Sequence, residues 1–498
     1  MAAAAKRVAK FIGIDLSTTA FAVGVRSVKG DEDFVSIPMS GATKWHDQPA
    51  FWLEFVPPMF INVLEELMGQ GWIFGENGAL SFSVRQHDMV LLDKECRPMI
   101  PALSWQCVAA TKEVKELRKL GVQKTVGRIE ERFILPKLMW ALRQDTPSLR
   151  GKLWHVMTTG DFIALMLTGR FSLSTSDALS NGLLDQNTKA LAEGVLRKAS
   201  LDPAWFPEPI PSGTVVALVQ PPSLGDEASA SWNAIRDILQ GWRVVAGLGD
   251  NHSSGVGCGL KDLRTMVVSG GSSGTVIRKA RSCWQLEGKA ANFEYYDDRL
   301  LLMMLADCAV WYDRFVKQFG EGKTLAQLDK LALRADLSRL VRVRQRKTES
   351  GWEEIYPKNW DKLGLAEKVA STQASIAMEL LLLTYKMLFE VSDIGATLIN
   401  NFVLTGGLSQ SVFFQQVFRE ELPDLWTKRP KVWVSDHKGP LAHKSAALGA
   451  MINAMVGAGR YPDLASAIQD LCPLKPAARV SGKGKGLLSD FFGKHARY

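Results

Sequence analysis

A β-prone segment with small residues and hydroxyls at a bend occurs twice in the sequence, and this repetition constrains the fold more than any other feature. The first copy, FIGIDLSTTAFAVGVRS (11–27), has one carboxylate, Asp15, and three hydroxyls at its bend. The second begins at WRVVAGLGDNHSSGVGCG (242–259) and continues through TMVVSGGSSGTVIRK (265–279). Such a repeat is expected of a chain that holds two related α/β domains with a cleft between them.

The length of the chain supports the same division. With 498 residues, the chain exceeds what one core organises, and two large domains are expected. We predict an N-terminal domain over residues 1–255, a C-terminal domain over 256–475, and a basic, flexible tail over 476–498.

Hydrophobic periodicity and turn residues predict the main elements. In the N-terminal half we expect a hairpin over 8–28, a third strand in EDFVSIPM (32–39), strands in ALSFSVRQ (79–86) and MVLLD (89–93), a helix over 49–68 and a helix-rich stretch over 111–168. The helical stretch 111–168 ends at the C-cap signal Gly169. In the C-terminal half we expect helices over 372–392, 411–422 and 444–459, and a strand in NFVLTGG (401–407).

Composition excludes several classes of protein. No run of about eighteen apolar residues is present, which excludes a membrane-spanning helix. The net charge of +8 is concentrated in VRVRQRK (341–347) and the tail, without a base-reading motif, so we expect no nucleic-acid partner. The six cysteines form no CxxC pair, and the N-terminus lacks a secretory cleavage site; a cytoplasmic protein is expected.

The first bend has two readings. Hydroxyls and free backbone N–H groups at Ser17, Thr18 and Thr19 suit the oxygens of a phosphate, and Asp15 beside them suits a Mg²⁺ held through water. A Ser/Thr turn without any ligand fits the same residues equally well. These residues alone leave both readings open.

A second carboxylate follows the small residues of GLGD (247–250). Asp250 at the end of a strand, with little bulk around it, is placed to accept a proton from a hydroxyl nucleophile. The alternative is an Asp that caps the helix beginning near His252, and both roles are compatible. The loop SGGSSG (269–274), which follows shortly after, offers another phosphate-binding bend.

A third group of polar residues lies at strand ends in the N-terminal half. His87 and Asp88 in VRQHDMVLLD, and Trp105 and Gln106 in LSWQC, combine polar groups with an indole face. Such a set suits a sugar, which presents hydroxyls on one side and C–H groups on the other. A structural role is the alternative for each residue taken singly.

With these residues in view, the sequence resembles the FGGY carbohydrate kinases, most closely their xylulokinase-like branch. The resemblance rests on motifs that occur in the family's order over nearly the whole chain. The quoted segments are GIDLSTTAFAVGV, KWHDQPAFW, VRQHDMVLLDKECRPMIPALSWQ, PKLMWALRQDTP, TTGDFIALMLTGRFSLSTSDALSNGLLD, GLGDNHSSGVGCG, VVSGGSSGTV, VLTGGLSQSVFFQQVF and SAALGAMINA.

The resemblance implies an α/β fold of two actin-like, ribonuclease-H-like ATPase domains, with ATP and a sugar meeting in the interdomain cleft. It implies that Asp250 is the catalytic base and that Asp15 helps to hold Mg²⁺. The implied phosphate and nucleotide contacts are Ser17, Thr18, Thr19, Gly271, Ser272, Ser273, Gly406, Gly407, Ser411 and Gln416. The implied sugar contacts are His87, Trp105, Gln106, Asp250 and Asn251.

The expected function is ATP-dependent phosphorylation of a small sugar, with a ketopentose such as xylulose as the leading acceptor. The chain departs from that branch at two places. After Trp105 it reads WQCVAAT, and the segment RVRQRKTESGWEEIYPKNW stands where the family usually has a Gly-Glu-Arg-x-Pro loop. Another ketose or a polyol of the glycerol or erythritol type is therefore an alternative acceptor. A non-catalytic actin-like nucleotide-binding module is the alternative from another class. Assembly as a homodimer is left open.

Overall fold

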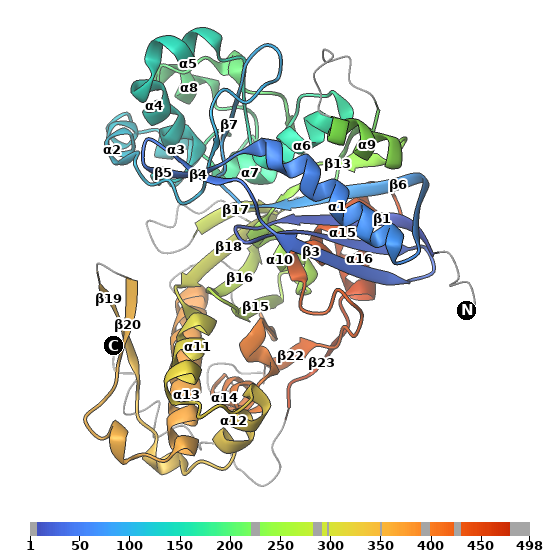
Figure 1. Cartoon of the computed structure of the whole chain (residues 1–498). Coiled ribbons are helices and arrows are strands. Elements are labelled where there is room, and N and C mark those ends of the chain that lie inside the picture. The colour runs from blue at the N-terminus through green and yellow to red at the C-terminus, as the bar shows by residue number, and fades with distance from the viewer. Residues whose placement is uncertain are drawn as a thin grey trace.

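The computed structural model describes residues 7–220, 230–281, 291–295, 298–348, 351–389, 399–422 and 430–478. The tail predicted at 476–498 lies outside the described residues, apart from 476–478. Two large β-sheets, one from each half of the chain, are stacked with helices between and around them (Figure 1).

The first sheet has the strand order β12-β13-β6-β1-β2-β3, with β14 also paired to β6. Its strands are β1 (Arg7–Leu16), β2 (Ala20–Ser27), β3 (Glu32–Pro38), β6 (Trp72–Val84), β12 (Val215–Leu218), β13 (Arg243–Val245) and β14 (Leu248–Gly249). The neighbours β1, β2 and β3 are antiparallel, whereas β6 is parallel to β1, β13 and β14. The predicted hairpin and third strand are confirmed.

The second sheet has the order β17-β18-β16-β15-β21-β22-β23. Its strands are β15 (Thr265–Gly270), β16 (Gly274–Ala280), β17 (Ala291–Tyr295), β18 (Asp298–Leu305), β21 (Asn401–Thr405), β22 (Lys431–Ser435) and β23 (Leu474–Pro476). Strands β15, β16 and β18 are antiparallel and β15, β21 and β22 are parallel. The two sheets therefore share strand directions, as the repeated segments predict.

Helices cover both faces of the first sheet. On one face lie α1 (Val56–Gly69), α6 (Thr159–Thr168) and α9 (Ala230–Ile238); on the other lies α15 (Ser445–Gly457), which is packed against α10 (Asp250–Gly257). Helix α15 comes from the far end of the chain but contacts β1, β2 and β6. A hydrophobic core joins both helices to residues of the two sheets, such as Phe11 and Val403.

Two further helical groups flank the sheets; the upper one has a core largely of its own, and the lower one shares its core with the second sheet. The upper group in Figure 1 contains α2 (Thr111–Lys119), α3 (Gln123–Val126), α4 (Ile134–Gln144), α5 (Thr146–Lys152), α7 (Thr175–Ser180) and α8 (Glu193–Lys198). The lower group contains α11 (Cys308–Phe319), α12 (Leu325–Ala332), α13 (Leu365–Phe389) and α14 (Val412–Glu421), and α16 (Leu464–Leu471) packs on α15. None of the described helices combines the length and apolar character that a bilayer crossing requires.

Small strands connect these parts. They are β4 (Ala42–Trp45), β5 (Gln48–Phe51), β7 (Val90–Leu92), β8 (Ala102–Leu103), β9 (His155–Met157), β10 (Leu173–Ser174), β11 (Pro209–Ile210), β19 (Arg344–Thr348) and β20 (Gly351–Ile355). The prediction of a helix over 49–68 is wrong at its start, because residues 48–51 pair with β4 and β8, and the α-helix begins at Val56. Pro57 in the first turn is compatible with a helix beginning there.

The predicted division at residue 255 falls within α10. The domain limits 1–255 and 256–475 stay a prediction, and the packing of α15 on the first sheet shows that residues near 450 are part of the N-terminal half's structure.

Candidate active site

The two candidate carboxylates lie at the carboxyl ends of two parallel strands, β1 and β14, that both pair with β6. Asp15 on β1 is in register with Ser83 on β6, and Ser83 is in register with Leu248 on β14. Asp250 follows directly after β14, as the first residue of α10. Because ligands of parallel α/β sheets bind beyond the carboxyl ends of the strands, this edge is where a substrate is expected.

A cavity of about 530 Å³ opens at this edge, between the two sheets. It is lined by predicted residues from both halves, including His87, Trp105, Asp250, Asn251 and Ser273. The other lining residues are Gln86, Arg132, Ser254, Cys258, Val267, Ser269, Thr275, Ile277, Leu302, Met304, Ala306, Asp307, Thr405 and Ser445. The volume is typical of a site for a small-molecule ligand.

Burial makes both carboxylates weak acids. Desolvation raises the pKa of Asp250 to about 6, and the negative charge of Asp88 adds to this, while the Asn251 N–H opposes it. Desolvation also raises the pKa of Asp15 to about 6, with a smaller contribution from the charge of Asp250 and an opposing one from Ser83. A carboxylate tuned in this way is suited to take up a proton near neutral pH.

Asn251 is held by a chain of hydrogen bonds that begins at the end of β6. Its side-chain amide donates to Oε1 of Gln86 (2.9 Å) and to Oδ1 of Asp250 (3.1 Å). Nε2 of Gln86 lies 3.3 Å from Nδ1 of His252. Gly249 permits this contact, because a Cβ there would come within 2.5 Å of Cγ of Gln86. The network orients both Asp250 and Asn251 toward the cavity.

His87 is fixed in a strained backbone conformation with φ of 73°. Its ring stacks on Phe133, with the centroids 4.7 Å apart, and Nδ1 lies 3.0 Å from Oδ1 of Asn181. Nζ of the fully buried Lys137 donates to its carbonyl oxygen (2.7 Å) and to that of Ser104 (2.8 Å). Burial lowers the pKa of His87, so the ring is neutral at pH 7.

Trp105 connects the predicted sugar side to the first bend. Its backbone N–H donates to Oδ1 of Asp88 (2.9 Å), whose other oxygen pairs with Nε of Arg85 (2.6 Å). Its indole N–H donates to Oγ1 of Thr18 (3.0 Å). Thr18 and Thr19 are otherwise exposed, and Ser17 closes the bend by bonding Ala20.

The second sheet brings two glycine loops together. A Cβ on Gly406, where φ is 79°, would come within 2.5 Å of the backbone nitrogen of Gly271. Ser272, Ser273 and Gly407 are exposed at these loops. Ser269 and Ser273 of the loop line the cavity, and the first bend is connected to it through the hydrogen bond between Thr18 and Trp105.

Of the sixteen predicted site residues, five line this cavity and eleven do not; the eleven are Asp15, Ser17, Thr18, Thr19, Gln106, Gly271, Ser272, Gly406, Gly407, Ser411 and Gln416. Gln106 is exposed beside Trp105. Ser411 caps α14 and donates to Oδ1 of Asp329 (2.5 Å), and Gln416, on the same helix, donates to Glu420 (2.7 Å). Their roles as ligands of sugar and nucleotide stay predictions.

The donor set is compatible with Mg²⁺. Asp15 and Asp250 are half-buried carboxylates, the charge of Asp250 raises the pKa of Asp15, and a cation would relieve this repulsion. Among the described residues no group of three or more His, Cys, Asp or Glu side chains lies close enough to hold a metal. Mg²⁺ commonly takes one or two carboxylates and obtains its other ligands from phosphates and water.

Several lining residues were not predicted from the sequence. Gln86 directly precedes His87 in VRQHDMVLLD, and this adjacency to a predicted sugar ligand was the only sequence feature that pointed to Gln86. Asp307 approaches from the second half and pairs with Arg314 (2.9 Å), which also pairs with Glu354 of β20 (2.6 Å). The hairpin β19–β20, which stands in place of the Gly-Glu-Arg-x-Pro loop, is thereby connected to the cavity through Arg314 and Asp307. No local sequence pattern predicts this connection.

Comparison with known proteins identifies this arrangement. Residues 12–257 match the model of the N-terminal domain of the FGGY family of carbohydrate kinases. The xylulose kinase of Lactococcus lactis subsp. lactis (strain IL1403) is 26% identical over 336 residues, which cover 64% of this chain and 63% of the relative. That of Streptomyces rubiginosus is 28% identical over 253 residues, covering 49% of this chain and 50% of the relative. The matches thus span between half and 63% of these two relatives.

Solved structures resemble the whole chain. Xylulose kinase from Rhodospirillum rubrum has a TM-score of 0.77 at 17% identity, covering 98% of both chains. Plasmodium falciparum glycerol kinase with ADP has a TM-score of 0.78 at 14% identity, covering 99% of this chain and 98% of that one. The predicted fold class, two actin-like, ribonuclease-H-like domains with a cleft, is confirmed. The match over residues 12–257 supports assignment of the chain to the FGGY family of carbohydrate kinases.

Proposed function

We propose that this protein is an ATP-dependent sugar kinase that transfers the γ-phosphate of ATP to a hydroxyl of a small ketose, with xylulose as the leading acceptor. The observation that carries the proposal is the position of Asp250 in the cavity between the two sheets, with its raised pKa and its link to Gln86 and Asn251. The matched xylulose kinases support the choice of acceptor.

In the proposed reaction, Asp250 accepts the proton of a sugar hydroxyl while that oxygen attacks the γ-phosphorus. The bond between the γ-phosphorus and the bridging oxygen breaks, and ADP leaves. The backbone N–H groups of residues 18–19 and 271–273 would donate to the oxygens that gain negative charge, whereas the N–H of Ser17 donates to the carbonyl oxygen of Ala20 (3.0 Å). Asp15 would hold Mg²⁺, which supplies charge neutralisation at the phosphates when bound. His87, Trp105 and Asn251 orient the sugar.

The acceptor is tested by ADP release across a panel of ketoses, glycerol and erythritol, with and without each acceptor. Turnover with a ketose, and none with the polyols, is expected. Turnover with a polyol alone would show that the acceptor is a polyol and not a ketose. ADP release that does not depend on any acceptor would contradict the kinase and favour an ATPase, and ATP binding without turnover would favour a binding module.

We expect the activity to fall on acidification through pH 6. Asp250 must be ionised to take the proton, and with a pKa of about 6 only about one molecule in ten is ionised at pH 5. kcat/KM, measured with both substrates below saturation, should decrease about tenfold per pH unit below 6, and more steeply if Asp15 must also be ionised.

Acid unfolding would not explain this loss. The pKa values of Asp15 and Asp250 are raised in the folded state, so their contribution to stability is complete below pH 4 and is lost as the pH rises through 6. Circular dichroism should therefore show the same folded signal at pH 7 and pH 5. A kcat/KM that stays constant down to pH 5 would contradict the role of Asp250.

Replacing Trp105 should weaken sugar binding selectively. Trp105→Ala removes an apolar face of the cavity, and we expect the KM for the sugar to rise about tenfold while the KM for ATP changes less than about twofold. Trp105→Phe keeps a ring and should recover most of the affinity. Trp154→Ala is the control, because Trp154 is 45% exposed and outside the cavity lining. An equal rise in both KM values would indicate a general structural role instead.

A further inference from the structure

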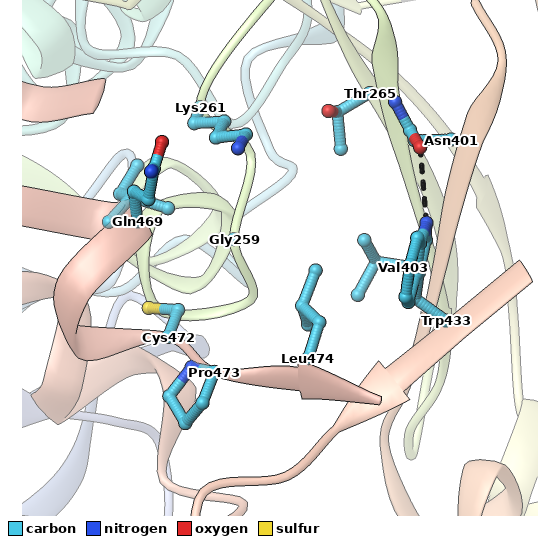
Figure 2. Close-up of a pocket in the computed structure, with 11 residues that line it drawn as sticks. Gly259, Lys261, Thr265, Asn401, Val403, Trp433, Gln469, Cys472, Pro473 and Leu474 are labelled. Carbon is cyan, nitrogen blue, oxygen red and sulfur yellow. Dashed lines mark hydrogen bonds between the residues drawn. The ribbon is translucent and has the colours of Figure 1, made fainter. Parts of the chain in front are cut away.

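A second cavity, of about 300 Å³, lies at the opposite ends of two strands that reach the active site (Figure 2). Strand β15 begins at Thr265 in this cavity and reaches the active-site cavity at Ser269. Strand β21 begins at Asn401 here and reaches the active-site cavity at Thr405. The proposed reaction uses none of the residues that line it.

One wall of this second cavity is apolar and contains an indole. Trp433 on β22, Val403 on β21 and Leu474 on β23 contribute to it, and Leu474 points into the space in Figure 2. The indole N–H of Trp433 donates to Oδ1 of Asn401 (3.1 Å). The polar edge of the ring is therefore satisfied by the protein, and the rest of the ring is available to a planar apolar group.

The facing wall contributes a positive charge. Lys261 is half-buried and its ammonium points into the cavity in Figure 2. It has no ion pair within the part of the chain that the structure describes. The neighbouring Asp262 is engaged elsewhere, because it accepts from the backbone N–H of Arg264 (2.9 Å) and from the hydroxyl of Thr265 (2.8 Å). The exposed amide of Gln469 stands at the rim.

We propose that this cavity binds a small organic carboxylate with a planar apolar body. The carboxylate would pair with Lys261, and the body would lie against Trp433, Val403 and Leu474. One cation favours a single negative charge. A volume of about 300 Å³ accommodates roughly ten non-hydrogen atoms, at about 30 Å³ for each water-sized group. It is at the lower end of the range for ligand sites.

Occupation of this cavity is expected to be communicated to the active site. Gly259 and Cys472 line it, and the thiol of Cys472 donates to the carbonyl oxygens of Val256 (3.6 Å) and Gly257 (3.5 Å). These carbonyls belong to the last turn of α10, the helix that begins at Asp250. A ligand would thus contact β15 and β21 directly and the end of α10 through Cys472. By linkage, ligand and substrate should change each other's affinity by the same factor.

Isothermal titration calorimetry on the full chain, without ATP or sugar, tests the site with sodium benzoate. We expect benzoate to bind at least about tenfold more tightly than benzyl alcohol, which has no charge, and inorganic phosphate, which has no apolar body, not to bind. Lys261→Met and Trp433→Ala should each weaken benzoate binding about tenfold or more. Lys112→Met is the matched control, because Lys112 is an exposed residue of α2 and should have no effect.

Three results would overturn the site: no heat of binding with benzoate, equal affinity for benzyl alcohol, or unchanged affinity in Lys261→Met. Thermal melts of the variants distinguish lost binding from lost folding. The titration needs no turnover, so it succeeds or fails independently of the proposed kinase reaction. At saturating benzoate, the KM for ATP or sugar should change at least about twofold in the wild type but not in Lys261→Met. Binding of benzoate without such a change in KM would overturn the proposed coupling to the active site but not the binding site itself.

Discussion

Asp250→Asn should reduce phosphoryl transfer by about 10²- to 10⁴-fold, because the amide cannot accept the proton of the attacking hydroxyl. The substitution keeps the size of the side chain, and the amide oxygen can still accept from the side chain of Asn251, as Oδ1 of Asp250 does at 3.1 Å. Single-turnover measurements of ADP formation with the preferred sugar give the rate of the chemical step. Titration with ATP should give a Kd within a few-fold of the wild type, because the phosphate contacts come from other residues.

Asn251→Asp is a useful partner to this variant. It keeps an acid near the cavity but loses the amide that donates to Gln86 and Asp250. We expect it to retain more activity than Asp250→Asn. Turnover close to the wild-type value in Asp250→Asn would exclude Asp250 as the base.

Gly449→Ala should destabilise the whole molecule more than any other conservative change that we predict. A Cβ at this position would overlap the carbonyl oxygen of Ser253, which belongs to the backbone of α10 and cannot rotate away. Gly257 faces the carbonyl oxygen of Ser445 in the same way, so α10 and α15 are in backbone contact at two points. Overpacking of this kind typically costs about 1 to 3 kcal/mol, and we expect the upper end.

Differential scanning calorimetry measures the effect. A loss of about 3 kcal/mol corresponds to a decrease in Tm of roughly 6 to 12 °C for a cooperative unit of about 150 to 250 residues. The control is Gly69→Ala in α1, where the added Cβ would meet no atom within 4 Å; it should leave the Tm unchanged or raise it slightly. If Gly449→Ala melted at the wild-type temperature, the two helices would have to be separable in solution.

Local sequence patterns predicted the strands and bends well, because Gly, Ser or Thr residues at each bend follow runs of β-branched residues that form the strands. The hairpin at 11–27 and the strands at 243–249 and 265–280 lie where the pattern places them. The helix limits were harder. Residues 48–51 form a strand because β4 and β8 pair with them, and no period within the segment reports that pairing.

The candidate site was predictable only in part, for a related reason. Asp15 and Asp250 could be proposed singly from their bends, but their proximity depends on β6, which pairs with both β1 and β14. Gln86 and Asp307 have no motif of their own. They reach the cavity through the backbone bend after β6 and through the turn before α11, where Asp307 has φ of 52°. Such residues become visible only when the strands are assembled.

The position of α15 has a consequence for synthesis of the chain on the ribosome. Strands β1, β2 and β6 are complete once residue 84 has emerged, yet the helix that covers one of their faces comprises residues 445–457. At bacterial or eukaryotic elongation rates of about 5 to 20 residues per second, that face waits roughly 20 to 70 s for its partner. The nascent N-terminal half therefore keeps this apolar face without its covering helix throughout most of translation.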